Sequence, residues 1–273
     1  MMTSSDRPRR ERLDRLLVTR GLVPTRARAQ ALIMAGRVLS LGVRLEKPGM
    51  RIPEETPLEI RPGPLYVSRG GLKLAWALPA AGLTARDKNA LDVGASTGGF
   101  TEVLLKDGAR RVIALDVGRG QLDWGLRNDA RVVPIEGVNA RYLEPATLPF
   151  VPEIAVMDVS FISLVLVLPA VMKCIGDDGE LLSLVKPQFE VGRRQVGRGG
   201  IIRDPALHRE VLEKVADFAR QSGWSLRNVL RCPVKGAEGN VEFFVHLAPS
   251  GPGIDPETAA EKIAAALEQD PAS

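Results

Sequence analysis

The ten residues Leu91-Asp92-Val93-Gly94-Ala95-Ser96-Thr97-Gly98-Gly99-Phe100 join a short apolar run to a turn of small residues. The run at residues 89–93 is long enough for a buried strand, and residues 100–106 continue with the apolar spacing of an amphipathic helix. A strand, a glycine-rich turn and a helix in this order begin the nucleotide-binding half of a doubly wound sheet. We therefore expect a Rossmann-like α/β domain built around this stretch.

The residues of this turn favour S-adenosylmethionine over a dinucleotide. Ser96 stands where a dinucleotide-binding turn carries its second glycine, and Asp92 would repel a phosphate. Asp116 ends the next predicted strand, where a carboxylate can accept hydrogen bonds from both hydroxyls of a ribose. A nicotinamide cofactor and a purely structural turn are the alternatives. The predicted cofactor-binding residues are Asp92, Gly94, Ser96, Thr97, Gly98, Gly99, Phe100, Asp116, Gln121, Asn139 and Asp158.

The composition of the 273 residues is that of a globular protein, with 45% hydrophobic and 26% charged residues. The sequence contains no apolar run long enough to cross a membrane, and its first residues lack the apolar core of a signal peptide, so a cytoplasmic location is expected. Cys174 and Cys232 lie far apart and are expected to be free thiols. With two histidines in the chain, no cluster has metal-ligand spacing, and no metal is expected.

Basic residues concentrate near the N-terminus. Residues 7–51 hold twelve arginines and lysines against three acidic residues, a net charge of +9, while the whole chain carries +4. The remaining residues therefore sum to −5. A basic module on a mildly acidic body indicates binding of a polyanion, and the predominance of arginine favours bidentate contacts to phosphate. A solvated basic hairpin without a partner is the alternative.

The same basic segment predicts a small α+β module. Apolar spacing predicts helices over residues 12–21 and 24–36, and strand-like runs follow at residues 38–41 and 57–60. In the second helix, the residues expected to face inward are Ala27, Ala31, Leu32 and Met34. Two helices and a small sheet in about fifty residues would place the arginines of the second helix on one basic face.

Several motifs of this module resemble an S4 RNA-binding domain, namely Arg12-Leu13-Asp14, Gly21, Arg26, Ala29, Leu32-Ile33 and Gly36-Arg37-Val38. The chain departs from that family at Ser40-Leu41-Gly42, where S4 domains usually carry Val-Asn-Gly. The resemblance implies that basic residues of the module bind RNA. The glycine- and arginine-rich loop at residues 192–200 is expected to hold RNA phosphates as well, unless it is merely a solvated loop. The predicted RNA-binding residues are Arg12, Arg15, Arg26, Arg28, Arg37, Arg69, Arg193, Arg194 and Arg198.

A domain boundary is expected at Arg61-Pro62-Gly63-Pro64, because two prolines and a glycine continue neither a strand nor a helix. The predicted organisation is a disordered basic tail (1–10), an S4-like domain (11–60), a linker (61–65), an α/β domain (66–249) and a helical or disordered tail (250–273). In the α/β domain, predicted strands at 89–93, 111–115, 131–135, 153–158, 180–185, 225–231 and 240–247 alternate with helices that include 121–126, 162–174 and 205–223. This alternation predicts a doubly wound, mostly parallel sheet of about seven strands, covered on both faces.

Four charged residues are candidates for chemistry. Asp158 and Lys186 end predicted strands, and ligands bind at the carboxyl ends of strands in such sheets. Lys73 lies in an apolar helix, and Glu242 interrupts an apolar strand, where a carboxylate needs a partner. We expect the four to line one cleft. A structural ion-pair network is the alternative, as is, for Lys73, a side chain whose amine reaches solvent.

These four residues lie within or beside four motifs, Val67-Ser68-Arg69-Gly70-Gly71, Asp158-Val159-Ser160-Phe161-Ile162-Ser163, Lys186-Pro187-Gln188-Phe189-Glu190 and Gly239-Asn240. The set resembles the Lys-Asp-Lys-Glu tetrad of the FtsJ-type RNA ribose 2′-O-methyltransferases. The whole chain resembles the TlyA family, which joins an S4 domain to that fold and was historically called haemolysin. The resemblance implies transfer of a methyl group from S-adenosylmethionine to a ribose 2′-hydroxyl of ribosomal RNA, with cytidine as the expected nucleotide.

The chemistry of such a transfer explains the tetrad. The enzyme must position a ribose hydroxyl for in-line displacement and remove its proton. Lys186 is the predicted base, because partial burial and the like charge of Lys73 favour a neutral amine, while Asp158 and Glu242 orient the two amines. The competing hypotheses are a pore-forming haemolysin, a ribosome-assembly factor that holds the cofactor without catalysis, and a dehydrogenase.

Overall fold

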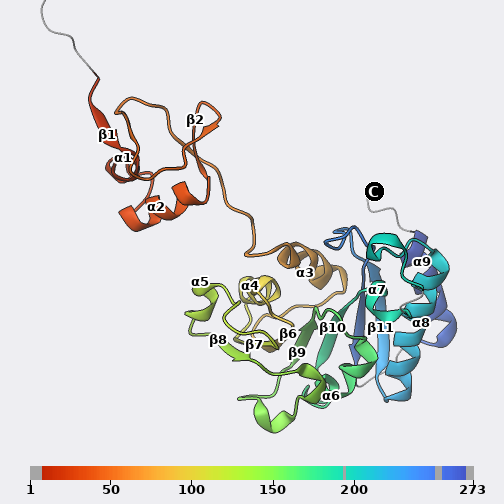
Figure 1. Ribbon diagram of the computed structural model, residues 1–273. Coiled ribbons are helices and arrows are strands. Elements are labelled where there is room, and N and C mark those ends of the chain that lie inside the picture. Colours follow the sequence, from red (N-terminus) through yellow and green to blue (C-terminus); the bar gives the residue numbers. More distant parts are fainter. Residues whose placement is uncertain (1–7, 193–194, 250–253, 269–273) are drawn as a thin grey trace, which may run out of the picture. The chain divides into compact units, whose positions relative to one another are not determined.

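The chain divides into two compact units, residues 1–64 and residues 65–273 (Figure 1). The computed structural model describes residues 8–192, 195–249 and 254–268, without the side chain of Arg198. Each unit has a hydrophobic core of its own. The core of the first unit contains nine buried apolar residues, and two larger cores lie in the second.

The N-terminal unit consists of two helices and two small antiparallel sheets. Its helices are α1 (Leu13–Thr19) and α2 (Arg26–Met34). One sheet pairs β1 (Arg10–Arg12) with β4 (Arg51–Pro53), and the other has the order β3 (Val43–Arg44), β2 (Val38–Ser40), β5 (Glu59–Ile60). Arg10 therefore lies in a strand and not in the expected tail, of which residues 1–7 are outside the described part of the chain.

The buried face of α2 differs from the predicted one. The helix buries Ala29, Leu32 and Ile33. Leu32 was correctly predicted to face inward, but the other three predicted residues, Ala27, Ala31 and Met34, are exposed. The difference is due to a polar contact between the two helices. Arg26 and Gln30 lie one turn apart on α2, and both side chains donate hydrogen bonds to Asp14 of α1. This contact sets the rotation of α2 about its axis.

Asp14 is the centre of a buried polar network in the N-terminal unit. Its side chain is fully buried and accepts hydrogen bonds from Arg12 (Nε and Nη2, both 3.0 Å), Arg26 (Nε, 2.9 Å) and Gln30 (Nε2, 2.9 Å). The Arg12 guanidinium, helped by Gln30 and Arg26, holds the pKa of Asp14 well below its usual range. Two of the predicted RNA-binding arginines thus have a structural partner inside this unit.

The second unit is built on one seven-stranded sheet in the order β11-β12-β10-β9-β6-β7-β8. Its strands are β6 (Asn89–Val93), β7 (Arg111–Asp116), β8 (Val132–Glu136), β9 (Ile154–Met157), β10 (Glu180–Val185), β11 (Ser225–Arg231) and β12 (Phe243–Ala248). Strands β6 to β10 run parallel, and β12 runs antiparallel to both of its neighbours. The predicted mostly parallel, seven-stranded sheet is confirmed, although the last strand begins at Phe243, so that Glu242 precedes it.

Helices cover both faces of this sheet (Figure 1). They are α3 (Arg69–Ala80), α4 (Gly99–Lys106), α5 (Trp124–Arg127), α6 (Leu168–Met172), α7 (Pro187–Glu190), α8 (Pro205–Gln221) and α9 (Pro256–Glu268), with short 3-10 turns η1 (Ala140–Tyr142), η2 (Pro145–Thr147), η3 (Leu164–Leu166) and η4 (Arg198–Gly200). Successive strand residues point to opposite faces, so Leu91 and Val93 pack in the core of α6, α8 and α9, whereas Ala90 packs in that of α3 and α4.

Three predicted elements differ in detail from the observed ones. The helix expected over residues 121–126 begins only at Trp124, because Asp123 caps it by accepting hydrogen bonds from Gly125 N and Leu126 N. The single helix expected over residues 162–174 is divided into η3 and α6, because Pro169 has no N–H to donate and restricts the backbone of the residue before it. Near the C-terminus, α9 buries Ile263 and Ala266 in the core of the sheet. This part of the expected tail is therefore a packed helix, while residues 250–253 and 269–273 lie outside the described residues.

The Asp14 network gives a stability prediction. Asp14→Ala should destabilise the N-terminal unit by about 2–4 kcal/mol, because it removes the common acceptor of three donors and opens a cavity. Hydrogen exchange read by mass spectrometry should show faster exchange in α1 and α2, with β6 to β10 as the unchanged internal reference. Since the pKa of folded Asp14 is depressed, the network's contribution should be present at neutral pH and be lost as the pH falls below about 4. Unaltered protection of α1 and α2 in the variant would contradict this account.

Candidate active site

The parallel register places the carboxyl ends of four strands along one edge of the sheet. Gly94 follows β6, Asp116 ends β7, Asp158 follows β9 and Lys186 follows β10. Gly94 has a positive φ of 86°, and a Cβ at this position would lie 2.5 Å from the backbone oxygen of Asp158. Only glycine allows the turn after β6 to lie this close to the start of the loop that carries Asp158.

The four predicted catalytic residues form two close ion pairs. Lys73 Nζ lies 2.5 Å from Glu242 Oε2 and donates a hydrogen bond to it, and Lys186 Nζ lies 2.5 Å from Asp158 Oδ1. Their side chains are between 3% and 19% exposed. The sequence therefore identified four charges that the fold does bring to one edge. It did not predict how they are paired, since the partners lie 169 and 28 residues apart.

Lys186 has a second polar partner that the sequence did not reveal. Its Nζ donates a hydrogen bond of 2.8 Å to Ser160 Oγ, while its ion pair with Asp158 lacks hydrogen-bond geometry. The amine thus lies beside two groups, the Asp158 carboxylate and the Ser160 hydroxyl, of which Ser160 accepts a hydrogen bond from it.

Three cavities meet at these side chains. The first, of about 360 Å³, is lined by Asp116, Gln121 and Asn139 with the apolar Val117, Val138 and Ile162. The second, of about 220 Å³, is lined by Ser68, Arg69, Thr97, Gly99 and Phe100. The third, of about 430 Å³, is lined by Lys186, Gln188, Phe189, Asn240 and Glu242. Gly94, Ser96 and Asp158 line both the first and the second, and Lys73 lines both the second and the third.

The first two cavities fit the parts of S-adenosylmethionine. Asp116 accepts hydrogen bonds from the backbone N–H groups of Ser96 (2.8 Å) and Gly118 (2.6 Å), which fixes its carboxylate and leaves lone pairs for a ribose. The apolar wall beside it suits an adenine. In the second cavity, Asp158 can receive an ammonium group, and the N-terminus of α4 offers backbone N–H groups for a carboxylate. The absence of a phosphate from this cofactor agrees with the two acidic residues.

Two predicted cofactor contacts lie elsewhere. Asp92 is fully buried beneath the turn, where Thr101 donates a hydrogen bond of 2.7 Å to its Oδ2. Gly98 is the N-cap of α4, and a Cβ there would lie 2.3 Å from Leu126 of α5. Both residues shape the turn from behind and line none of the three cavities. The other nine predicted contacts line at least one.

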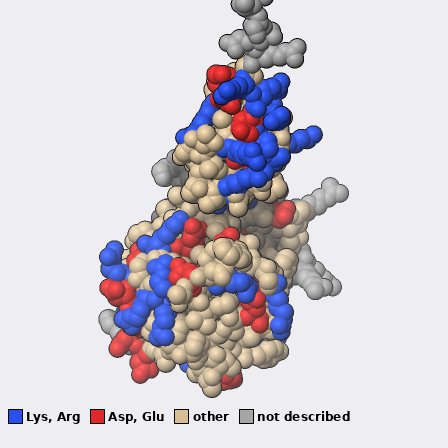
Figure 2. All heavy atoms as spheres, turned by 90° about the vertical axis from the view of Figure 1, so that its left-hand side faces the viewer, with Lys and Arg blue, Asp and Glu red and all other residues tan. Residues whose placement is uncertain are grey.

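The predicted RNA-binding arginines are not equivalent. Arg15 and Arg28 are exposed, and Arg37 donates hydrogen bonds to the backbone oxygen of Arg61. Arg69 lines the second cavity and donates a hydrogen bond of 2.8 Å to the backbone oxygen of Lys235. Arg193, Arg194 and the side chain of Arg198 lie outside the described part of the chain. Figure 2 shows lysine and arginine side chains gathered on one face of the N-terminal unit.

An aromatic pair at the third cavity was not identified from the sequence. Phe161 is 90% exposed, has a positive φ of 63°, and its ring centroid lies 5.0 Å from that of Phe189. The buried Glu190 links the two segments that carry these rings. It directly follows Phe189, and it accepts hydrogen bonds from Ser163 Oγ (2.5 Å) and Leu164 N (2.6 Å), which lie shortly after Phe161. Sequence motifs contained these residues, but an exposed phenylalanine with left-handed backbone cannot be recognised without coordinates.

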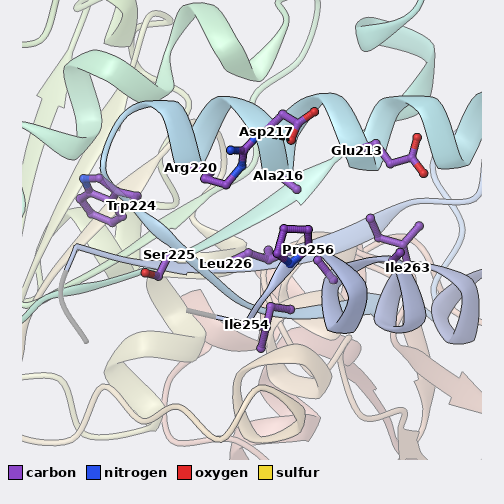
Figure 3. A pocket seen from close by; sticks show the side chains of 12 residues that line it. Glu213, Ala216, Asp217, Arg220, Trp224, Ser225, Leu226, Ile254, Pro256 and Ile263 are labelled. Carbon is purple, nitrogen blue, oxygen red and sulfur yellow. Dashed lines mark hydrogen bonds and ion pairs between the residues drawn. The ribbon is translucent and has the colours of Figure 1, made fainter. Parts of the chain in front are cut away.

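A further hollow, of about 270 Å³, lies between α8, β11 and α9 (Figure 3). Apolar Trp224, Leu226, Ile254 and Ile263 line it together with Glu213, Asp217 and Arg220. It shares no lining residue with the three cavities described above. We therefore do not assign it to the candidate active site.

Comparison with known proteins agrees with this geometry. Residues 66–248 match the family of FtsJ-like methyltransferases, and residues 11–56 match the S4 domain. A Mycobacterium tuberculosis protein, the 16S/23S rRNA (cytidine-2′-O)-methyltransferase TlyA, is 46% identical over 241 residues, which cover 88% of this chain and 90% of that protein. The chain belongs to the TlyA family of FtsJ-like methyltransferases.

Other relatives carry both kinds of name found in this family. Hemolysin A of Brachyspira hyodysenteriae is 40% identical over 86% of this chain and 98% of its own length. A solved structure from Streptococcus thermophilus, described as a hemolysin, has a TM-score of 0.71 and 45% identity, covering 95% of this chain and 96% of that one. A methyltransferase from Listeria monocytogenes, described as S-adenosylmethionine dependent, shares the fold alone, with a TM-score of 0.50 and 11% identity over 67% of this chain and 99% of that one.

Three further expectations concern metals, thiols and membranes. In the part of the chain that the structure describes, no group of three or more potential metal ligands occurs. Cys174 and Cys232 are both buried free thiols, as predicted. None of the described helices is long and apolar enough to span a bilayer.

Burial of Asp92 gives a pH prediction. Desolvation, opposed by Thr101 and reinforced by the charges of Asp158 and Asp116, raises the pKa of Asp92 to about 7. When folding raises the pKa of a carboxyl, the folded protein becomes less stable as the pH rises from about 4 to 7. Without cofactor, the free energy of unfolding of Asp92→Asn should therefore equal that of the wild type near pH 4 and exceed it by roughly 1–3 kcal/mol at pH 8.

Urea unfolding followed by tryptophan fluorescence measures this difference. Trp76, Trp124 and Trp224 all belong to the second unit, so the signal reports on the unit that contains Asp92. A stability difference between variant and wild type that stays constant from pH 4 to pH 8 would show that Asp92 does not titrate in the folded chain.

Proposed function

We propose that this protein transfers the methyl group of S-adenosylmethionine to the 2′-hydroxyl of a cytidine in ribosomal RNA. The observation that supports it most is the position of the Lys186–Asp158 pair, because Asp158 lines the two cofactor-sized cavities and Lys186 lines the third cavity. A reacting ribose in the third cavity would thus be next to the cofactor. The relative from Mycobacterium tuberculosis, which is named for methylation of cytidine in rRNA, supports the substrate class. An rRNA substrate also agrees with the cytoplasmic location expected from the sequence.

The bound cofactor supplies an activated methyl group on a positively charged sulfur, and the protein must supply an oxygen nucleophile. In the proposed reaction, Lys186 as the free amine would accept the proton of the 2′-hydroxyl at Nζ, while that oxygen takes the methyl group and the carbon–sulfur bond of the cofactor breaks to leave a neutral thioether. Asp158 lies 2.5 Å from this amine and stabilises the ammonium that results. Ser160 accepts a hydrogen bond from the same amine and so limits its rotation.

The second ion pair has a different role. Lys73 is held by Glu242 and lines both the second and the third cavity, so its positive charge lies beside the place where the hydroxyl loses its proton. We propose that it stabilises negative charge that develops on the 2′-oxygen. Glu242 keeps the buried lysine compensated, because an unpaired buried charge would destabilise the fold.

We propose that the aromatic pair of Phe161 and Phe189 binds the base of the target nucleotide. Phe161 lines the first and the third cavity and is almost wholly exposed, which suits a ring that stacks on a base displaced from the RNA helix. The N-terminal unit (residues 11–60 in the predicted division) is assigned the docking of structured RNA through its basic surface. Neither role requires a protein partner or a metal.

The proposal as a whole is tested by methyl transfer in vitro. Purified protein, bacterial ribosomal subunits or their rRNA, and S-adenosylmethionine with a tritiated methyl group should give labelled RNA. Digestion to nucleosides should then yield 2′-O-methylcytidine. Label on a base, or no label in either subunit's RNA while the protein binds S-adenosylmethionine, would contradict the proposal.

Lys186 is expected to be indispensable for the chemical step. Both Lys186→Ala and Lys186→Arg should reduce the single-turnover rate by about 100-fold or more, because a guanidinium stays protonated and cannot act as a base. Dissociation constants for cofactor and RNA should change little. The matched control is Lys173→Arg, an exposed lysine at the end of α6, which should keep the wild-type rate. An active Lys186→Arg enzyme would mean that the lysine only orients other groups.

Phe161 is expected to act on RNA and not on the cofactor. Phe161→Ala should lower kcat/KM for RNA by about 10- to 100-fold through lost stacking, with an unchanged dissociation constant for S-adenosylmethionine. Phe161→Trp should restore most of the activity, since it keeps an aromatic face. If Phe161→Ala and Phe161→Trp are equally impaired, the ring has a packing role and does not stack on a base.

A further inference from the structure

The β2–β3 hairpin of the N-terminal unit ends in an unusual turn. Leu39 pairs with Arg44 and Ser40 with Val43, so the turn consists of Leu41 and Gly42 alone. Both have positive φ, 48° and 82°, as a type I′ turn requires. Such turns favour asparagine or glycine at the first position, because left-handed backbone is unfavourable for a leucine.

Burial does not compensate for this backbone. Leu41 is 85% exposed and Val43 is 67% exposed, so the tip of the hairpin presents two apolar side chains to solvent. Among the large apolar side chains of residues 8–192, 195–249 and 254–268, only Phe161 is more exposed than Leu41. Both have left-handed backbone. Since neither the turn nor the core accounts for Leu41, the tip has the properties of a contact surface.

The charges around the tip indicate the kind of partner. Residues 36–45 contain Arg37 and Arg44 and no acidic residue, although Glu59 of the neighbouring β5 pairs with Leu39. The Arg44 side chain lies against Gly36, at the base of the hairpin, where a Cβ would be 3.7 Å from its Cδ. The tip thus presents two apolar side chains within a segment that carries a strong positive charge. A partner that offers both phosphates and apolar faces matches this combination, and unpaired RNA nucleotides do so.

We propose that the Leu41–Val43 tip packs against the exposed face of an unpaired base in the RNA substrate, beside phosphates held by Arg37 and Arg44. The inference rests on the proposed function for the identity of the RNA. It goes further in assigning to the N-terminal unit a preference for structured RNA with an unstacked nucleotide over a continuous duplex.

The test compares Leu41→Asn with Arg44→Ala in binding to purified bacterial rRNA over a series of salt concentrations. Asparagine suits the left-handed turn, so Leu41→Asn should fold at least as well as the wild type. It should bind rRNA about tenfold more weakly at every salt concentration, because an apolar contact releases no counterions. Arg44→Ala should instead reduce the slope of log K against log salt by about one.

Two further arms make the result decisive. On a perfectly paired RNA duplex, Leu41→Asn should bind as the wild type does, and on rRNA Leu41→Phe should keep wild-type affinity. Wild-type affinity of Leu41→Asn for rRNA, or an equal loss on duplex and rRNA, would overturn the proposal. Methyl transfer by the wild-type protein is measured in parallel. If transfer occurs and Leu41→Asn binds normally, the tip assignment alone fails; if rRNA binding depends on Leu41 but no transfer occurs, the proposed function fails and the tip assignment stands.

Discussion

The candidate active site depends on the close approach of the turn after β6 to the backbone at Asp158. Gly94 has no side chain there because a Cβ would lie 2.5 Å from the Asp158 oxygen, and Asp158 N donates a hydrogen bond of 2.9 Å to Val93. This backbone contact fixes one carboxylate where the two cofactor-sized cavities meet. Lys186 follows the next parallel strand and reaches the same carboxylate from the third cavity. A side chain in place of Gly94 would push apart the turn after β6 and the Asp158 backbone, which together line both the first and the second cavity.

Two separate ion pairs allow one fold to hold two lysines close to one substrate site. Each amine is compensated by its own carboxylate, so neither buried charge is left unpaired. The pairs differ in their surroundings, because the Lys73–Glu242 pair is the more buried and the Lys186–Asp158 pair is accompanied by Ser160. A difference of this kind permits two roles, one amine as a fixed positive charge and the other as an acceptor of a proton.

Much of this arrangement could be predicted from the sequence. Periodicity and glycine spacing predicted the parallel sheet, because the alternation of strands and helices can be read from local sequence. The same patterns correctly identified Asp116, Asp158 and Lys186 as residues at the carboxyl ends of strands. The sequence predicted Asp92 as a cofactor contact, but in the structure this residue is buried beneath the turn, where Thr101 donates a hydrogen bond to it. The position of Asp92 in the motif does not reveal this contact. The rotation of α2 was also mispredicted, since the Asp14 network joins residues of two helices that hydrophobic spacing does not relate.

Backbone strain was the other feature beyond the reach of sequence patterns. A left-handed conformation costs a non-glycine residue roughly 1–2 kcal/mol. Four such residues occur in the described chain, and three of them are Ser96 in the cofactor turn, Phe161 at the third cavity and Leu41 at the hairpin tip. We propose a ligand contact for each of these three residues but none for the fourth, Asp87, and such contacts cannot be read from a sequence alone.

The central claim is that the reacting ribose lies in the third cavity with its 2′-oxygen beside Lys186. A structure of the protein bound to an rRNA fragment and a non-reactive analogue of S-adenosylmethionine tests it most directly. The account predicts the 2′-oxygen within hydrogen-bond distance of Lys186 Nζ and in line with the methyl-bearing atom of the analogue. A 2′-oxygen that points away from Lys186, or a base in place of the ribose beside that amine, would contradict it.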